Sequence, residues 1–107
     1  MDRLLAEACR EFPDWRFSRT EDGRAATSAR VALSAATLAE LRHIVRAVTP
    51  WHVWRSDVGR WWASRNRPFS PAAEEAGAHR TVDGDDLGEL CRVIVEQENL
   101  ADLATGP

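Results

Sequence analysis

The side chains best suited to chemistry in this sequence are three histidines and two cysteines. The histidines, His43, His52 and His79, are scattered and show neither the HxxxH nor the HxH spacing that lets two of them share a zinc ion. Cys9 and Cys91 stand alone without a CxxC pair, which is typical of reduced thiols in a cytosolic protein, although a disulfide between them stays open as an alternative. The sequence therefore predicts no metal site and no cofactor.

Signatures of catalytic nucleophiles and of nucleotide-binding loops are missing from the sequence. It contains no GxSxG, Walker or GxGxxG motif. The acidic run at residues 83–86, DGDD, lacks the other ligands of a calcium-binding loop and fits the start of a helix better. We therefore predict that the protein is not an enzyme and has no catalytic residues.

The most unusual segment is residues 51–65, WHVWRSDVGRWWASR, which holds four of the five tryptophans. Residues 51–67 carry four arginines and one aspartate, a net charge of +3, whereas residues 68–107 have a net charge of −7. The tryptophans thus lie in a basic segment of an acidic chain. Because tryptophan and arginine are enriched at binding hot spots, this segment is the predicted working surface.

An internal repeat supplies the elements that position this segment. The stretch WRFSRTEDGRAATS, from Trp15, aligns with WHVWRSDVGRWWAS, from Trp51, at an offset of 36. Further along, TLAELRHIV, from Thr37, aligns with DLGELCRVI, from Asp86, at an offset of 49. The ordered agreement predicts a duplication in which the second copy carries 13 extra residues between its hairpin and its helix (49 − 36).

Each copy has the pattern of a β-hairpin, a third strand and a helix. Apolar and polar residues alternate before and after a glycine-containing turn, and Thr37-x-x-Glu40 and Asp86-x-x-Glu89 resemble helix caps. Third strands are expected at residues 30–33 and 80–82, and a first helix at residues 2–12. The predicted fold class is α+β, a tandem βββα repeat in the order α-βββ-α-βββ-α, with antiparallel hairpins packed on helices.

The chain is expected to form a single α+β domain over residues 1–103, with residues 104–107 as a frayed tail. After the N-terminal helix, the two repeats occupy about residues 12–48 and 49–98. The 44% content of hydrophobic residues excludes a disordered chain, and no apolar run approaches the ~20 residues of a membrane span. The charged N-terminus differs from a secretory signal peptide, so we expect a cytoplasmic protein without membrane association.

The register of the second hairpin decides which tryptophans face solvent. A four-residue turn with Arg55 opposite Arg60 pairs Trp54 with Trp61. Alternation of side chains then predicts an inner set and an outer set, which a slip of one residue would exchange. The predicted core residues are Trp15, Phe17, Trp51, Val53 and Trp62. The predicted partner-binding residues are His52, Trp54, Arg55, Arg60, Trp61 and Arg65.

Three functions stay open for this surface. It can bind a protein partner, such as a transcriptional regulator or a second copy of the chain, with the arginines contacting acidic groups. It can bind single-stranded nucleic acid or RNA by stacking bases on indoles. It can also be purely structural, as core or homodimer interface, particularly if residues 66–79 cover the tryptophans. The first function, a non-enzymatic regulatory module, is the main prediction.

Two resemblances bear on these alternatives. The run WHVWRSDVGRWWASR followed by RTVDGDDLGEL resembles short actinobacterial proteins of unknown function with a W-R-S-D-x-G-R-W-W-A hairpin and a T-V-D-A-D-like strand. This resemblance implies a regulatory or accessory role, since such proteins are often encoded near helix-turn-helix regulators, and it implies that Gly84 in place of alanine is a harmless change. The α-βββ-α order also resembles the double-stranded-RNA-binding fold, but the acidic residues 83–86 replace the basic cluster of that family.

Overall fold

A computed structural model describes residues 3–29 and 31–105, the side chain of Thr105 excepted, and it confirms the α+β class and the order of elements. Two three-stranded antiparallel sheets are present, with strand orders β1-β2-β3 and β4-β5-β6. A further short helix, α3, lies between β5 and β6. The elements are α1 (Arg3–Glu11), β1 (Arg16–Thr20), β2 (Gly23–Thr27), β3 (Ala32–Ala35), α2 (Leu38–Val48), β4 (Trp51–Arg55), β5 (Trp61–Arg65), α3 (Pro71–Glu75), β6 (Thr81–Gly84) and α4 (Leu87–Thr105).

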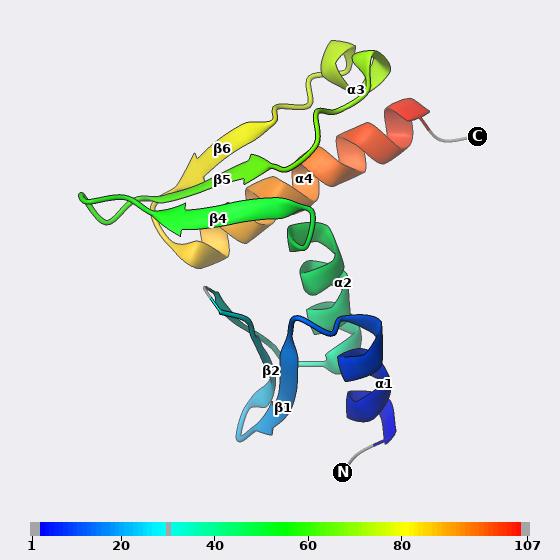
Figure 1. The fold of residues 1–107 in the computed structure, drawn as a ribbon, viewed down its shortest axis with the longest axis vertical. Helices are drawn as coiled ribbons and strands as arrows, with labels where there is room; N and C mark the ends of the chain where they lie inside the picture. Colours follow the sequence, from blue (N-terminus) through cyan, green and yellow to red (C-terminus); the bar gives the residue numbers. More distant parts are fainter. Residues whose placement is uncertain (1–2, 30, 106–107) are drawn as a thin grey trace. The chain divides into compact units, whose positions relative to one another are not determined.

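The chain divides into two compact units, residues 1–46 and 47–107, each containing one sheet (Figure 1). This division lies within α2, close to the predicted boundary between the repeats. Helix α4 continues through Thr105, so the expected tail is helical over its first two residues, and residues 106–107 lie outside the described part. The expected third strand at residues 30–33 begins at Ala32 instead, and Arg30 of that range is outside the described residues.

In the first unit, α1 and α2 supply apolar residues to a core that includes the inner face of the sheet. Phe17 pairs with Ala26 across the hairpin, and both side chains are buried, which confirms the predicted place of Phe17 in the core. The exposed Glu11 carboxylate at the end of α1 forms ion pairs with Arg42 and Arg46 of α2. These cations hold the pKa of Glu11 below its usual value, the hydrogen bond from Arg46 being the largest cause.

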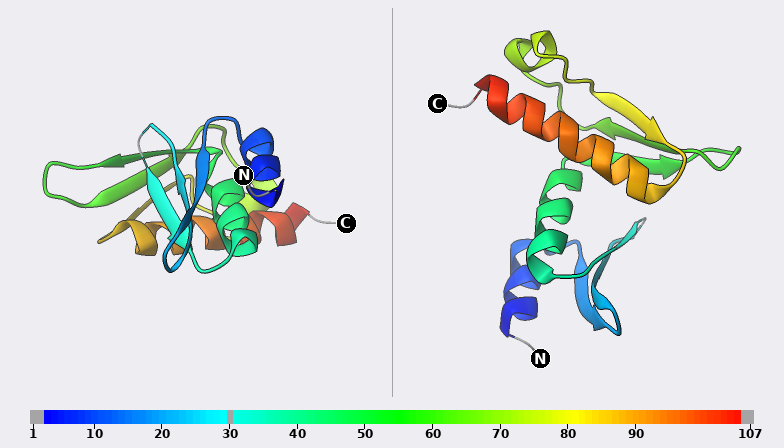
Figure 2. Two further views of the ribbon diagram at one scale, coloured as in Figure 1. Left: turned by 90° about the horizontal axis from the view of Figure 1, so that it is seen from below. Right: turned by 180° about the vertical axis from the view of Figure 1, so that it is seen from behind.

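In the second unit, α4 lies along one face of the sheet (Figure 2), and the inner side chains of Val53, Ala63 and Val82 are buried. Leu90, Ile94, Gln97 and Ala101 of α4 are buried at the spacing of a single helix face. Asp86 begins the helix as predicted, since its Oδ1 accepts a hydrogen bond from the Glu89 amide at 2.8 Å. The corresponding cap of α2 is confirmed too, with the Glu40 amide 3.2 Å from Thr37 Oγ1.

The turn of the second hairpin is one residue longer than predicted. Arg55 pairs with Trp61, which leaves residues 56–60 as the turn, and Gly59 adopts a φ of +81° that favours glycine. Val53 therefore pairs with Ala63, and Trp54 pairs with Trp62. The predicted register is wrong by one residue in β5, so Trp61 and Trp62 exchange faces.

The extra residues of the second repeat are consequently split between two places. Ala26 and Ala63 are equivalent because each pairs with the central apolar residue of the preceding strand, and their offset is 37. Leu33 and Val82 pair with these alanines, and their offset is 49. One extra residue therefore lies in the turn and 12 lie between β5 and β6 (49 − 37). Among the latter, Ser70 caps α3 by accepting a hydrogen bond from the Ala73 amide at 3.2 Å.

Gly84 lies where the last strand approaches the start of α4. A Cβ atom at this position would be 2.8 Å from the backbone nitrogen of Leu90, closer than two such atoms can pack. The close approach of β6 to α4 in this chain thus requires glycine at position 84.

We expect Gly84→Ala to lower the free energy of unfolding by about 1–3 kcal/mol, because the backbone of α4 must shift to make room. The measurement is urea denaturation followed by far-ultraviolet circular dichroism. Gly88→Ala is the matched control, since the added methyl group meets a side-chain oxygen of Asp86 at 3.3 Å rather than backbone. This control should change stability by less than about 1 kcal/mol, as helix propensity favours alanine. Equal losses in both variants would contradict the close approach.

Candidate functional site

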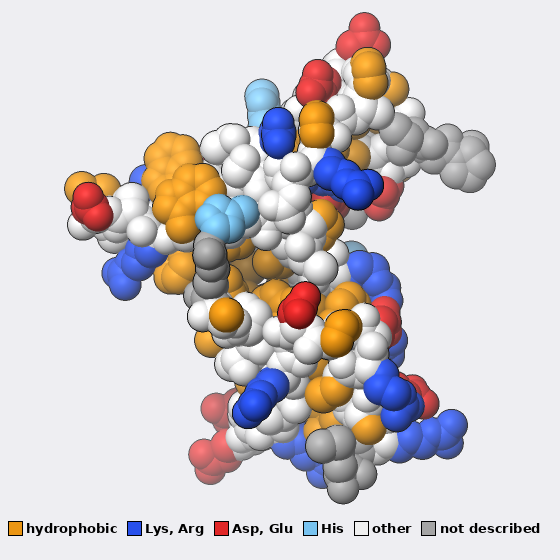
Figure 3. Space-filling view, in the orientation of Figure 1, with side chains coloured by type: hydrophobic (Ala, Val, Ile, Leu, Met, Phe, Trp, Pro, Cys, Tyr) orange, Lys and Arg blue, Asp and Glu red, His pale blue; other side chains and the backbone are white. Residues whose placement is uncertain are grey.

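Three aromatic side chains gather on the outer face of the second sheet, and we call His52, Trp54 and Trp62 the aromatic patch. The Trp54 and Trp62 rings stack with centroids 6.5 Å apart and an angle of 12° between their planes. His52 stacks on Trp54 at 5.5 Å. Trp54 remains 37% exposed. Figure 3 shows this face, where hydrophobic side chains and a histidine lie together over the β4–β5 hairpin.

Trp61, predicted as part of this patch, lies on the inner face together with Arg55. The guanidinium carbon of Arg55 is 5.9 Å from the centroid of the Trp61 ring, within the range of a cation–π contact. Trp62, predicted as core, is the residue that takes its place outside. The signal for Trp62 was present in the sequence: a gap of one residue in the turn aligns Ala63-Ser64 with Ala26-Thr27.

Arg60 is held by two carboxylates of the same unit. Its Nε donates to Asp83 Oδ2 at 2.7 Å, and its Nη1 forms an ion pair with Asp85. Asp83 lies on β6 directly opposite Trp62, so this contact fixes a neighbour of the aromatic patch. The hydrogen bond to Asp83 is the main reason that the pKa of Arg60 is raised above its usual value.

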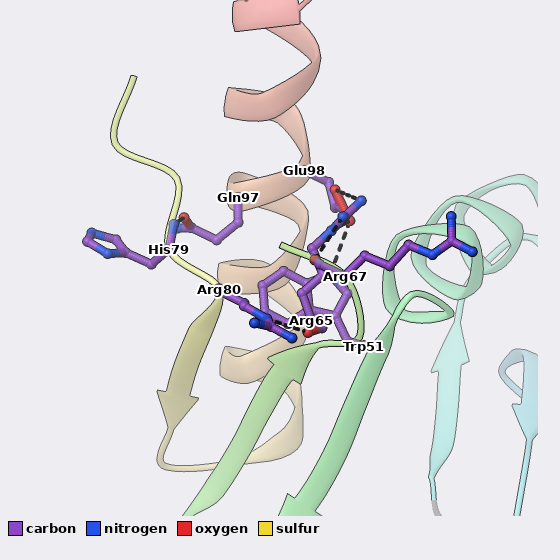
Figure 4. A network of polar contacts seen from close by, with 7 residues as sticks. All are labelled: Trp51, Arg65, Arg67, His79, Arg80, Gln97 and Glu98. Carbon is purple, nitrogen blue, oxygen red and sulfur yellow. Dashed lines mark hydrogen bonds and ion pairs between the residues drawn. The ribbon is translucent and has the colours of Figure 1, made fainter. Parts of the chain in front are cut away.

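Arg65 is directed to the helix side of the sheet, where Glu98 of α4 accepts a hydrogen bond from Arg65 Nε at 3.0 Å (Figure 4). Glu98 Oε1 also accepts the indole N–H of Trp51 at 3.1 Å. Both residues of the ion pair are largely buried, with side-chain exposures of 22% and 16%. Arg65 is therefore engaged inside the unit, and Glu98 is the residue that ties α4 to the hairpin.

The insert between β5 and β6 packs on α4 and on the inner edge of the hairpin. Phe69 meets Trp51 with ring centroids 6.0 Å apart, and the guanidinium of Arg65 lies 4.5 Å from the Phe69 ring. The buried side chain of Gln97 accepts the His79 amide at 2.7 Å. Helix α3 contacts α4. Residues 66–79 thus contribute an aromatic side chain to the core, while Trp54 stays exposed.

The first repeat has the same framework without an aromatic patch. Arg16 and Ser18 of β1 correspond to His52 and Trp54 of β4. Ala25, which pairs with Ser18, corresponds to Trp62. Because the first sheet forms with small or polar residues at these positions, the architecture itself does not require outward tryptophans.

The titratable groups outside the aromatic patch bear on metal binding and on thiol chemistry. Among residues 3–29 and 31–105, no group of three histidine, cysteine, aspartate or glutamate side chains is placed to hold a metal ion. Both cysteines are free thiols. Cys91 is buried on α4, and burial raises its pKa to about 11, which disfavours the nucleophilic thiolate. Within the described residues, every helix is too short or too polar to cross a membrane.

Removal of the Glu98 carboxylate should destabilise the second unit. Glu98→Ala leaves the Trp51 and Arg65 donors without their acceptor in a poorly hydrated position, and we expect a loss of about 1–3 kcal/mol in the free energy of unfolding. Glu96→Ala is the control on the same helix, because Glu96 is exposed. That variant should lie within about 0.5 kcal/mol of wild type in urea titrations. Similar stabilities of the two variants would show that Glu98 does not tie α4 to the hairpin.

The buried thiol of Cys91 predicts a loss of stability in alkali. Well below pH 9.0 the thiol is protonated in both states; as the pH rises through 9.0 towards 11, the unfolded chain ionises first and the free energy of unfolding falls. The expected loss is about 2 kcal/mol by the top of this range. Cys91→Ala should show a flatter profile in urea titrations across the same range. Because the chain has neither lysine nor tyrosine, few other groups titrate there. Parallel profiles for the two proteins would contradict this account.

Comparison of the chain with family models, with curated proteins and with solved structures finds no match.

Proposed function

We propose that the protein is a non-enzymatic, cytosolic binding module of a regulatory kind, and that the aromatic patch is its contact surface for a protein partner. The observation that carries this proposal is the stacked Trp54–Trp62 pair on the outer face of the second sheet. Exposed indoles cost solubility and are retained where they bury area against another molecule.

The first repeat supports a functional reason for the pair. Its equivalent strands carry Ser18 and Ala25, and they form a sheet of the same strand order with buried apolar residues at the equivalent inner positions. The two tryptophans therefore add a surface to a framework that is complete without them. An aromatic pair added to the outer face of one repeat is what selection for binding would produce.

The charges around the patch favour an apolar surface of a protein over a phosphate backbone. Arg60 and Arg65, which were predicted to contact acidic groups of the partner, are already paired with Asp83 and Glu98. Nucleic-acid binding depends on free cations that displace condensed counterions. With these arginines neutralised inside the unit, stacking and apolar burial remain as the main contributions of the aromatic patch.

The test replaces the patch with the residues of the first repeat, Trp54→Ser and Trp62→Ala together. We expect the fold to survive, with a loss of stability of about 0.5–1.5 kcal/mol from the stacked pair beyond its buried area. Quenching of tryptophan fluorescence by acrylamide should fall, because Trp15 and Trp51 are buried and Trp61, the other remaining tryptophan, is half-buried on the inner face.

Partner binding is measured with tagged wild type and the double variant as baits in the same cell extract, followed by affinity measurements on the purified partner. The double variant should lose at least about 30-fold in affinity, corresponding to about 2 kcal/mol. Leu103→Ser is the control, since Leu103 is an exposed apolar residue outside the patch. Equal affinities for wild type and the double variant, or unfolding of the double variant, would refute the proposal.

A further inference from the structure

The backbone of β4 offers hydrogen-bonding groups along a free edge of the second sheet. Within this unit, β5 is the only strand paired with β4 among the described residues. The Ser56 amide donates to the Arg60 carbonyl at 2.8 Å, and the Asn66 amide donates to Pro50 at 2.9 Å. Along an antiparallel strand, every second residue forms its backbone hydrogen bonds with the same neighbouring strand. Because residues 50 and 56 bond towards β5, the amides and carbonyls of residues 52 and 54 also point towards β5. Those of Trp51, Val53 and Arg55 consequently point away from β5.

The composition of this edge differs from that of β6, at the opposite edge of the same sheet, and from that of β1, the equivalent strand of the first sheet. Soluble proteins protect edge strands with charged side chains, proline or short length. Strand β6, at the opposite edge, is short and carries Asp83, with Asp85 directly after it. Strand β1, the equivalent of β4, carries Arg16 and Arg19. Strand β4 has the sequence WHVWR, with a single charged residue at its end.

We propose that β4 pairs antiparallel with β4 of a second copy of this chain, about a two-fold axis at Val53. This inference rests on the proposed function, because it enlarges the same aromatic patch. The register is self-complementary: Val53 meets Val53, and Trp51 of each copy meets Arg55 of the other, so that all outward backbone groups find partners. The second sheets of the two copies then join into one continuous sheet.

The same register brings the outer side chains together. His52 of one copy lies opposite Trp54 of the other in a non-hydrogen-bonded pair, the closer of the two antiparallel arrangements. Since His52 already stacks on Trp54 and Trp54 on Trp62 within one copy, the joined sheets carry one continuous aromatic surface. This doubled patch is the surface offered to the protein partner.

Charge selects the antiparallel arrangement. In parallel pairing the two Arg55 side chains would lie side by side, and like charges on neighbouring strands destabilise a sheet. Antiparallel pairing separates them by the length of the strand. The two-fold interface also closes on itself, because each copy uses its β4 edge once, whereas the short β6 edge, which carries the Asp83–Arg60 ion pair, disfavours further growth.

The first experiment measures mass by light scattering for wild type and two proline variants. Val53→Pro removes an outward amide without breaking a bond to β5, and Thr81→Pro does the same on the β6 edge. Wild type and Thr81→Pro should form a dimer of twice 12.0 kDa, and Val53→Pro should be monomeric with native circular dichroism. A wild-type monomer at every concentration, or a Val53→Pro dimer, would overturn the proposal.

Amide hydrogen exchange provides a readout that needs no variant. In the dimer the amides of Val53 and Arg55 should be protected, and dilution to the monomer should release them. The amides of His52 and Trp54, bonded to β5, should stay protected at both concentrations. Unprotected Val53 and Arg55 amides in a dimer, or protected ones in a monomer, would also overturn the proposal. Neither experiment changes the outward side chains of Trp54 and Trp62. Failure of the dimer can therefore be distinguished from failure of the proposed function, which is tested with the Trp54 and Trp62 double variant.

Discussion

The turn between β4 and β5 decides which face of the sheet every side chain of β5 occupies. Side chains alternate along a strand, so the number of residues in the turn sets the parity of everything that follows it. The Ser56 amide closes this turn on Arg60 at 2.8 Å, and Gly59 supplies the positive φ that a five-residue connection needs here. Its length puts the small side chain of Ala63 beneath α4 and turns Trp62 outward.

The electrostatic character of the second unit follows from the same arrangement. Once the parity of β5 is set, Arg65 points towards α4 and reaches Glu98, while Arg60 meets Asp83 and Asp85 at the end of β6. A segment that is strongly basic in sequence is thereby neutralised by carboxylates far along the chain. The two repeats share a framework of inner apolar residues, and they differ in what the outer face of the hairpin presents.

The sequence was sufficient to predict the order of elements, the duplication and the helix caps, because each of these depends on local patterns. The inner and outer faces of the first hairpin were predicted correctly, since its turn has the minimal length. The faces of Trp61 and Trp62 were predicted wrongly, because a one-residue difference in a turn leaves local hydrophobic alternation unchanged. The pairing of Arg60 and Arg65 depends on residues more than 20 positions away, and charge counts along a segment contain no information about such partners.

The insert that separates β5 from β6 has a consequence for the order of folding. In the first unit, all strand pairs are joined by short connections, so little chain entropy opposes their formation. In the second unit, β6 joins β5 only after residues 66–80 have been organised, and this is the least local strand pairing in the chain. We expect the β4–β5 hairpin to form early and the docking of β6 with α4 to come last. The free edge of β4 and its aromatic side chains would then be in place before the core beneath them is complete.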